Sequence, residues 1–384
     1  MSLHLTDVEW LINHPDAITA AEELPMTKKS AITDAAALRA DYGPAARALM
    51  ELVQARRASV GKLPTTWLMS ADAAQQATHA DVAQHRATYL RDVAQGAPIH
   101  DVTCSIGGDC AALSNAGFDV LGSDIDPARV RMAATNVPTA QFVRADALAP
   151  VSTGAVVLAD PARRSGGRRI SKPEDLIPPL PALLDAWQGS ELAVKCAPGI
   201  DYSDWDGAVD VVSVAGGVKE ACLYTPGLIR QGQRRKATVI RDGHTRHYDD
   251  TMADDCGVGP VDRYLIDPDG AVVRAGLVRH FAAAHHLHQI DERIAHLTGP
   301  AIPGGESGFE VLAQVGLKHV RRELAARDCG SVEVLIRGVD ADPDKLRKSW
   351  KLKGTQPLAV VVSRVGTSAV AFICGPREQR PVTP

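Results

Sequence analysis

The sequence predicts an α/β protein with a doubly wound parallel sheet, preceded by a helical region and followed by a small α+β region. Apolar residues recur at helical spacing over residues 1–95, and short apolar strands alternate with helical stretches from residue 96 onward. A chain of 384 residues exceeds what one hydrophobic core usually organises. We therefore expect a helical domain at residues 1–95, the sheet domain at 96–248, a connector at 249–309 and an α+β domain at 310–384.

The first region is expected to consist of helices, in a series that Pro64-Thr-Thr-Trp67 interrupts. Leu5, Val8 and Leu11 share one helix face, and alanine-rich stretches continue at residues 45–57 and 71–93. Ser70 is a suitable N-cap for one long helix running toward Arg91.

The central region is expected to alternate strands with helices, because parallel strands need helical crossovers between them. The expected strands lie near residues 98–103, 119–123, 140–143, 155–159, 191–195, 208–214 and 236–240. The expected helices lie at about residues 109–116, 127–135 and 173–187.

The last third of the chain is expected to hold a connector and a basic α+β domain. The connector has a strand at residues 263–266, helices across 275–297 and a Pro- and Gly-rich linker at 300–308. A strand at 332–337, a helix at 343–350 and strands at 358–363 and 368–373 follow. Residues 310–384 carry five Lys and eight Arg against eight acidic residues, a balance of +5 that leaves −9 for the rest of the chain.

Composition indicates a cytoplasmic protein with an aliphatic core. Hydrophobic residues make up 45% of the chain and aromatic residues only 4%, and no apolar stretch is long enough to span a membrane. The N-terminus lacks the basic and apolar pattern of a signal peptide. The seven scattered cysteines form no Cys-x-x-Cys pair, so we expect free thiols and no structural metal.

A glycine-containing turn is predicted where the first strand meets a helix, at Asp101-Val-Thr-Cys-Ser-Ile-Gly-Gly-Asp109. Gly107 and Gly108 would let the backbone approach a ligand closely. The turn lacks Gly-x-Gly-x-x-Gly spacing, and Asp109 at the helix start would repel a phosphate. The motif therefore favours a nucleoside cofactor without phosphates, although a tight turn with no ligand gives the same pattern.

Four further acidic residues follow three successive strands. Asp124 would accept the two hydroxyls of a ribose, whereas Asp126, before Pro127, is equally well explained as a helix N-cap. Asp146 follows the next strand and would meet an adenine. Asp160 ends the fourth strand, where its carboxylate could accept a hydrogen bond or a proton from a nucleophilic amine.

A basic loop follows Asp160 directly, and its arginines suit phosphate groups. A solvated loop without a ligand is the alternative explanation. The arginines predicted to bind substrate phosphates are Arg163, Arg164, Arg168 and Arg169.

In this order, the motifs resemble the bacterial class I S-adenosylmethionine (SAM) dependent methyltransferases that carry a C-terminal THUMP-like domain. The most specific parts are the Gly-Gly-Asp turn, Asp160-Pro-Ala-Arg-Arg164 and Val194-Lys-Cys-Ala-Pro-Gly-Ile-Asp201. Arg337-Gly-Val339 and its neighbouring strands are similar to the THUMP-like module. The resemblance implies a Rossmann-like class I sheet with SAM as the cofactor.

The resemblance also implies roles for individual residues. Asp160 would be the catalytic residue that faces the substrate. The residues that would bind SAM are Thr103, Gly107, Gly108, Asp124, Ile125, Asp146 and Ala147. Gln76 and Thr78 would either close over the methionine end of SAM or be ordinary helix-surface residues.

The resemblance points to RNA, in tRNA or rRNA, as the partner that is methylated by direct transfer. Asp160-Pro-Ala lacks the aromatic residue that stacks a flipped base in well-understood amino methyltransferases. Methylation of a small molecule or protein, and a non-catalytic RNA-binding protein that retains SAM, therefore remain alternatives. Cys196 would act only if catalysis were covalent, and a metal at His285, His286 and His288 is not expected.

Overall fold

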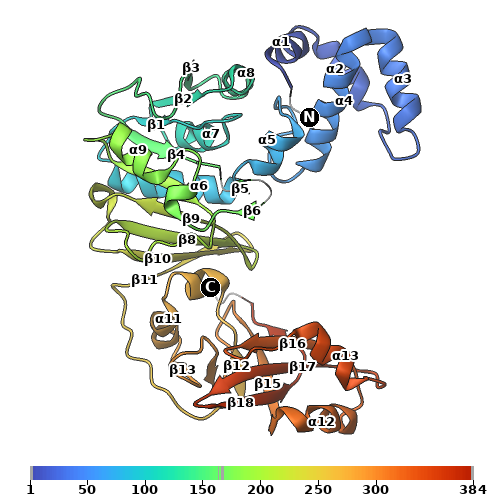
Figure 1. The fold of residues 1–384 in the computed structure, drawn as a ribbon, viewed down its shortest axis with the longest axis vertical. Coiled ribbons are helices and arrows are strands. Elements are labelled where there is room, and N and C mark those ends of the chain that lie inside the picture. Colours follow the sequence, from blue (N-terminus) through green and yellow to red (C-terminus); the bar gives the residue numbers. More distant parts are fainter. Residues whose placement is uncertain (1–2, 163, 166–167, 382–384) are drawn as a thin grey trace. The chain divides into compact units, whose positions relative to one another are not determined.

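The computed structural model describes residues 3–162, 164–165 and 168–381 and divides into two compact units (Figure 1). The first unit comprises Met1–Val214 and Val218–Arg234, and the second comprises Ala215–Gly217 and Arg235–Pro384. Each unit has hydrophobic clusters of its own.

Four N-terminal helices pack around an aliphatic core centred on Leu11, Leu49 and Leu52. These helices are α1 (Leu5–Asn13), α2 (Pro15–Glu22), α3 (Ala31–Tyr42) and α4 (Ala46–Ala58). The same core takes in Ile106 and Met132 from the sheet region, so the helices are packed against it. A hydrogen bond of 2.8 Å from the backbone N–H of Leu68 to Asn136 Oδ1 strengthens this junction.

The prediction of one long helix running from Ser70 toward Arg91 is wrong. Two helices occupy that stretch, α5 (Ala71–Gln76) and α6 (Ala80–Val93). Ser70 caps α5 as predicted, since its side chain accepts the backbone N–H of Ala73. The chain then turns extended at Ala77, with φ −53° and ψ 142°, and His79 caps α6. Residues 77–79 therefore leave the helical path.

A mostly parallel sheet forms the rest of the first unit and confirms the predicted doubly wound architecture. Its strands run in the order β8-β9-β7-β4-β1-β2-β3. The pairs β3-β2, β2-β1, β1-β4 and β4-β7 are parallel, and β9 is antiparallel to β7. The strands are β1 (Ile99–Asp101), β2 (Val120–Asp124), β3 (Gln141–Arg144), β4 (Val156–Ala159), β7 (Leu192–Cys196), β8 (Ala208–Val214) and β9 (Gly217–Tyr224). Strand β9 was not expected.

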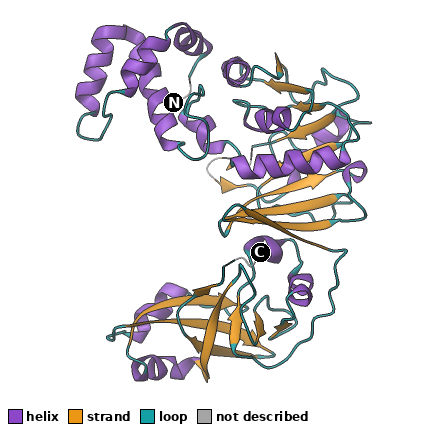
Figure 2. Cartoon of the chain, turned by 180° about the vertical axis from the view of Figure 1, so that it is seen from behind, coloured by secondary structure: helices purple, strands orange, loops and turns teal. Residues whose placement is uncertain are grey.

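Helices cover both faces of this sheet. Helix α6 crosses one face and α9 (Leu180–Ala186) lies on the other, as Figures 1 and 2 show from opposite sides. Helices α7 (Gly108–Asn115) and α8 (Pro127–Asn136) follow β1 and β2 and match the predicted helices. The helix expected at residues 173–187 is shorter, because Pro173, Pro178 and Pro179 lack the backbone N–H groups that a continuous helix needs.

The second unit begins with a hairpin and continues into a second sheet. The antiparallel hairpin joins β10 (Arg235–Arg241) to β11 (His244–Asp249), and the second sheet has the order β13-β14-β12-β15-β18-β17-β16, with β19 paired to β15. Its strands are β12 (Tyr264–Ile266), β13 (His288–Gln289), β14 (Leu297–Gly299), β15 (Ser307–Gly316), β16 (Cys329–Arg337), β17 (Gln356–Val365), β18 (Ser368–Cys374) and β19 (Glu378–Gln379). Its helices are α10 (Gly270–Arg274), α11 (Val278–Ala284), α12 (Val320–Ala326) and α13 (Pro343–Trp350).

The C-terminal strands, α13 and the connector strand β12 agree with the sequence prediction, and the helical stretch expected in the connector is only partly helical. Helix α11 ends at Ala284, so residues 285–297 are not helical and include strand β13. Strand β15 and helix α12 were not expected, and β15 begins at Ser307, inside the predicted linker. Pairing within the folded sheet determines where these strands form, because β12 lies between β14 and β15 and forms hydrogen bonds with both.

No helix in the described part of the chain is long and apolar enough to cross a membrane. All seven cysteines are buried.

Candidate active site

A cavity of about 610 Å³ opens where β1, β2, β4 and β7 end. In a parallel sheet this carboxyl edge is the usual place for a ligand. Most of the residues singled out in the sequence line the cavity, namely Thr103, Gly108, Asp124, Ile125, Asp146, Ala147 and Asp160. Gln76 and Thr78 line it as well, because the break between α5 and α6 brings that segment to the cavity.

The two glycines of the turn have different surroundings. Gly107 does not line the cavity. It has φ +90°, and a Cβ built there would lie 2.9 Å from Val137 Cγ2, so both its conformation and its packing require glycine. Gly108 begins α7, and a Cβ there would meet nothing within 4 Å. Gly107 therefore shapes the turn, and Gly108 faces the cavity.

Asp124 is a carboxylate held by the backbone. Its Oδ2 accepts the N–H of Ser105 and its Oδ1 accepts the N–H of Asp126, each at 3.0 Å. Each oxygen keeps a further lone pair for a ligand hydroxyl. Asp126 does not line the cavity. It is the N-cap of α8 and accepts the N–H of Ala128 at 2.8 Å.

The next wall of the cavity is apolar, with one acidic residue at its rim. Ile125 follows Asp124 and has 63% of its surface exposed. Asp146 accepts the N–H of Leu148, and the carbonyl of Ala147 accepts the indole N–H of Trp187 at 2.8 Å, which fixes the loop after β3. This part of the cavity therefore offers a ligand apolar surface together with one carboxylate acceptor.

Asp160 is held in a different way. Its backbone N–H donates to Thr103 Oγ1 at 2.6 Å, which joins the ends of β1 and β4. Its Oδ2 accepts a hydrogen bond from Lys195 Nζ at 2.6 Å, and 27% of its side chain is exposed. The carboxylate therefore faces the cavity while a buried ammonium group contacts it from behind.

Lys195 belongs to a buried ion-pair network that the sequence did not reveal. Lys195 also donates to Asp109 at 2.7 Å, Asp109 pairs with Arg86, and Arg86 pairs with Glu220. Burial alone would lower the pKa of Lys195, but Asp109 and Asp160 raise that pKa above its ordinary value. Burial would likewise raise the pKa of Asp109, but Arg86 and Lys195 hold it well below its ordinary value.

This network corrects the role expected for Asp109. Asp109 does not present a bare negative charge to a ligand, because two cations neutralise it. The sequence offered one signal for the network, a lysine at position 195 inside an otherwise apolar strand. Arg86, on the buried face of α6, and Glu220, on the unexpected strand β9, gave no comparable signal.

Asp101, at the end of β1, has weaker hydrogen-bond partners than Asp124 and Asp160. It accepts the N–H of Thr103 at 3.1 Å, and the Cys110 thiol lies 3.6 Å from its Oδ2. Burial, together with the nearby Asp109, raises the pKa of Asp101 to about 7. Asp101 therefore titrates near neutral pH at the floor of the cavity.

The basic loop is described only in part. Arg163 lies outside the described residues, and only the backbone is described for Arg164 in β5 (Arg164–Ser165) and for Arg168 and Arg169 in β6 (Arg168–Arg169). These two short strands pair with each other antiparallel. Before the loop, Ala162 pairs with Ile177, and both line the cavity beside Asp160.

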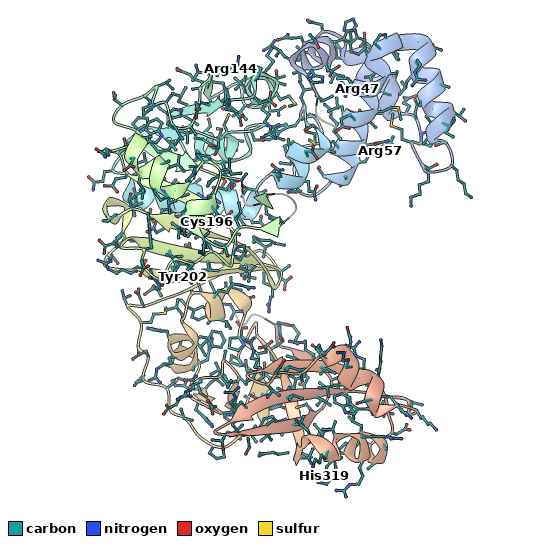
Figure 3. All side chains as sticks on the ribbon, viewed as in Figure 1. Arg47, Arg57, Arg144, Cys196, Tyr202 and His319 are labelled. Carbon is teal, nitrogen blue, oxygen red and sulfur yellow. The ribbon has the colours of Figure 1, made fainter. Side chains whose placement is uncertain are left out.

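The structure of the described residues does not support a catalytic role for Cys196 or a metal site at His285, His286 and His288. Cys196 is fully buried within the sheet (Figure 3) and does not line the cavity. His285 packs against Phe281 and contacts the hydroxyl of Tyr248 at 2.9 Å. In the described part of the chain no group of three or more His, Cys, Asp or Glu side chains is arranged to hold a metal ion.

Comparison with known proteins identifies relatives over most of the chain. Residues 307–376 match the family model described as THUMP domain-like. Two proteins of Mycobacterium tuberculosis, from strains CDC 1551 / Oshkosh and ATCC 25618 / H37Rv, are each named an uncharacterized S-adenosylmethionine-dependent methyltransferase. Each is 44% identical to this chain over 362 residues, which is 88% of this chain and 99% of the relative.

A solved structure extends the likeness to the fold. It is the crystal structure of a candidate methyltransferase from Porphyromonas gingivalis W83, with a TM-score of 0.68 and 15% identity over 99% of this chain and 100% of that one. This likeness shows a shared fold, and the mycobacterial relatives show the family. The protein belongs to the S-adenosylmethionine-dependent methyltransferases, uses SAM as its cofactor and carries a THUMP-like domain at its C-terminus.

Proposed function

We propose that this methyltransferase transfers the methyl group of SAM to a nucleophilic atom of an RNA base that is held beside Asp160. The cavity supplies the SAM site, and the C-terminal domain supplies an RNA-binding surface. The scattered cysteines suit a reducing compartment, which supports a cytoplasmic location.

The cavity residues fit the chemical groups of SAM. The carboxylate of Asp124 offers two oxygens to the ribose hydroxyls, and the apolar surface of Ile125 and Ala147 suits the adenine ring. Asp146 would accept the amino group of the adenine. The open surface at Gly108 leaves room for the methionine part, with Thr103, Gln76 and Thr78 around it.

The chemistry requires positioning more than bond activation by the protein. Bound SAM supplies a methyl group that its sulfonium already activates. The lone pair of the acceptor atom forms the new bond to the methyl carbon while the carbon–sulfur bond breaks and leaves its electron pair on sulfur. Asp160 accepts a hydrogen bond from the acceptor N–H and receives the proton, and the cavity walls limit the approach of water.

The observation that carries the RNA assignment is the THUMP domain-like module with its exposed cations. Helices α12 and α13 pack against the same sheet. Arg322, Arg327 and Arg347 pair with neighbouring acidic side chains, whereas six other exposed cations on and beside these helices form no ion pair with any described residue. These exposed residues are Lys318, Arg321, Lys345, Lys348, Lys351 and Lys353. Ammonium and guanidinium groups on one side of a domain bind phosphates largely independently of sequence.

The experiment uses labelled SAM and RNA from a strain that lacks the protein. After incubation, the RNA is digested to nucleosides, and a labelled modified base is the expected product. Its formation should weaken steeply as salt rises from about 50 to 200 mM, because phosphate contacts release counterions. Label in protein or in small molecules instead of RNA would contradict the proposal, as would SAM binding without any transfer.

A further inference from the structure

Lys195 has surroundings that a structural lysine does not need. It lies on β7 between Val194 and Cys196, and only 2% of its side chain is exposed. An ammonium group removed from water is costly unless its partners compensate for the lost hydration. The strand would form equally well with an apolar residue there, since β7 is buried along its whole length.

The hydrogen bonds of Lys195 use all three of its N–H groups. Nζ lies 2.5 Å from Thr78 Oγ1, 2.7 Å from Asp109 Oδ2 and 2.6 Å from Asp160 Oδ2. An ammonium group has three donors and no acceptor, so its orientation is completely determined by these contacts. The three partners come from the segment between α5 and α6, from the first turn of α7 and from the end of β4, three different walls of the cavity.

Charge neutralisation alone does not explain the contact with Asp160. Asp109 already has Arg86 as a partner, and Arg86 in turn is shared with Glu220. Asp160 has 27% of its side chain exposed, so water could solvate it without help from a buried cation. What the contact adds is a fixed direction for the carboxylate.

We propose that Lys195 is the positioning residue of the active site: it orients the carboxylate of Asp160 toward the methyl acceptor, and Thr78 determines where the ammonium group stands. This inference rests on the proposed role of Asp160. Thr78 can serve both partners because its hydroxyl accepts from Lys195 and donates to Asp109 at 2.9 Å. The segment that joins α5 to α6 thus contributes to the position of the reacting group.

A double-mutant cycle between Lys195→Met and Asp160→Asn tests the inference in the full-length protein. Labelled SAM is incubated with RNA, protein and small-molecule fractions of a strain that lacks the protein, and rates are measured on whichever fraction the wild type labels. Lys195→Met should lower kcat about 100-fold in the wild-type background and less than about threefold in the Asp160→Asn background. The KM for SAM should change by less than about fivefold.

The outcomes separate the inference from the proposed function. Equal losses in the two backgrounds would show a purely structural lysine and overturn the inference, even if RNA is labelled as proposed. Full activity of Asp160→Asn would remove the proposed role of Asp160, and the role of Lys195 with it. Label in a fraction other than RNA would refute the RNA substrate, and the cycle measured on that fraction would still decide the role of Lys195.

A pair of milder variants covers the case in which Lys195→Met does not fold. Thr78→Val removes the hydroxyl while preserving the shape of the side chain, and Thr78→Ser preserves the hydroxyl. We expect kcat to fall about tenfold for Thr78→Val and to stay within about twofold of wild type for Thr78→Ser. Full activity of Thr78→Val, or equal losses for both variants, would overturn the inference.

Discussion

Asp124 and Asp160 each stand where a parallel strand ends, and both line the same cavity, but they are held by different groups. Backbone N–H groups of Ser105 and Asp126 hold the carboxylate of Asp124. The carboxylate of Asp160 depends on the side chain of Lys195, which is 35 residues away in the sequence. Local backbone groups therefore fix the direction of the Asp124 carboxylate, whereas a distant side chain fixes that of Asp160.

The largest expected effect is that of Asp160→Asn on catalysis. Asparagine preserves the shape of the side chain but cannot take a proton, so we expect kcat to fall by about 10²- to 10³-fold. The affinity for SAM, measured by calorimetric titration, should stay within about threefold of wild type. A parallel loss of SAM affinity would instead place Asp160 on the cofactor side and remove the distinction from Asp124.

Asp101 is the intermediate case, a carboxylate with neither two backbone donors nor an ammonium partner. Burial and Asp109 raise its pKa to about 7, from 3.8 in a model compound. Between these two values the folded protein binds a proton that the unfolded chain does not. Asp101 therefore contributes stability that is fully present below about pH 4 and is lost as the pH rises through 7.

Urea unfolding of the wild type and of Asp101→Asn measures this contribution. The wild-type free energy of unfolding, relative to that of the variant, should fall by about 2 to 3 kcal/mol between pH 5 and pH 8. Other groups that titrate in this range, such as the buried Glu306, are present in both proteins and cancel. A difference that is independent of pH would show that Asp101 does not titrate between pH 5 and pH 8.

Asp124→Asn should produce the converse of Asp160→Asn. An amide replaces one acceptor oxygen with a donor, so one ribose hydroxyl loses its charged partner and the Kd for SAM should rise about tenfold or more. The kcat at saturating SAM should stay within about threefold of wild type. If kcat falls instead while SAM binding persists, Asp124 acts on the methyl-transfer step, and the proposed separation between a cofactor-binding Asp124 and an acceptor-facing Asp160 is wrong.

The smallest expected effect distinguishes Asp124 from its neighbour Asp126. Asp126 caps α8 through the N–H of Ala128. Asp126→Ala should therefore lower the free energy of unfolding by about 1 kcal/mol and leave the Kd for SAM within about twofold of wild type. Thermal unfolding and calorimetric titration give the two values, and a large loss of SAM affinity would assign Asp126 to the cofactor site.

Local sequence patterns were sufficient to predict the parallel sheet and the acidic residues that line the cavity at the strand ends. Alternating apolar strands and helices predicted β1 to β4 and β7, and the acidic residues at the strand ends line one cavity as expected. Asp124 could be recognised because it ends a strand, and its partners Ser105 and Asp126 lie within 19 residues of it, in the turns that follow β1 and β2. Strand β9 was missed, since its place beside β7 depends on pairing with a distant part of the chain.

The sequence by itself determined the order of strands, helices and strand-end carboxylates, because side-chain periodicity and turn residues act over a few positions. Only the tertiary structure decided how Asp160 is held. Arg86 and Glu220 are 134 residues apart, and Lys195 and Asp109 are 86 apart. No local pattern encodes such contacts, because ion pairs form only when the packed sheet and α6 bring these side chains within a few ångströms and exclude water from between them.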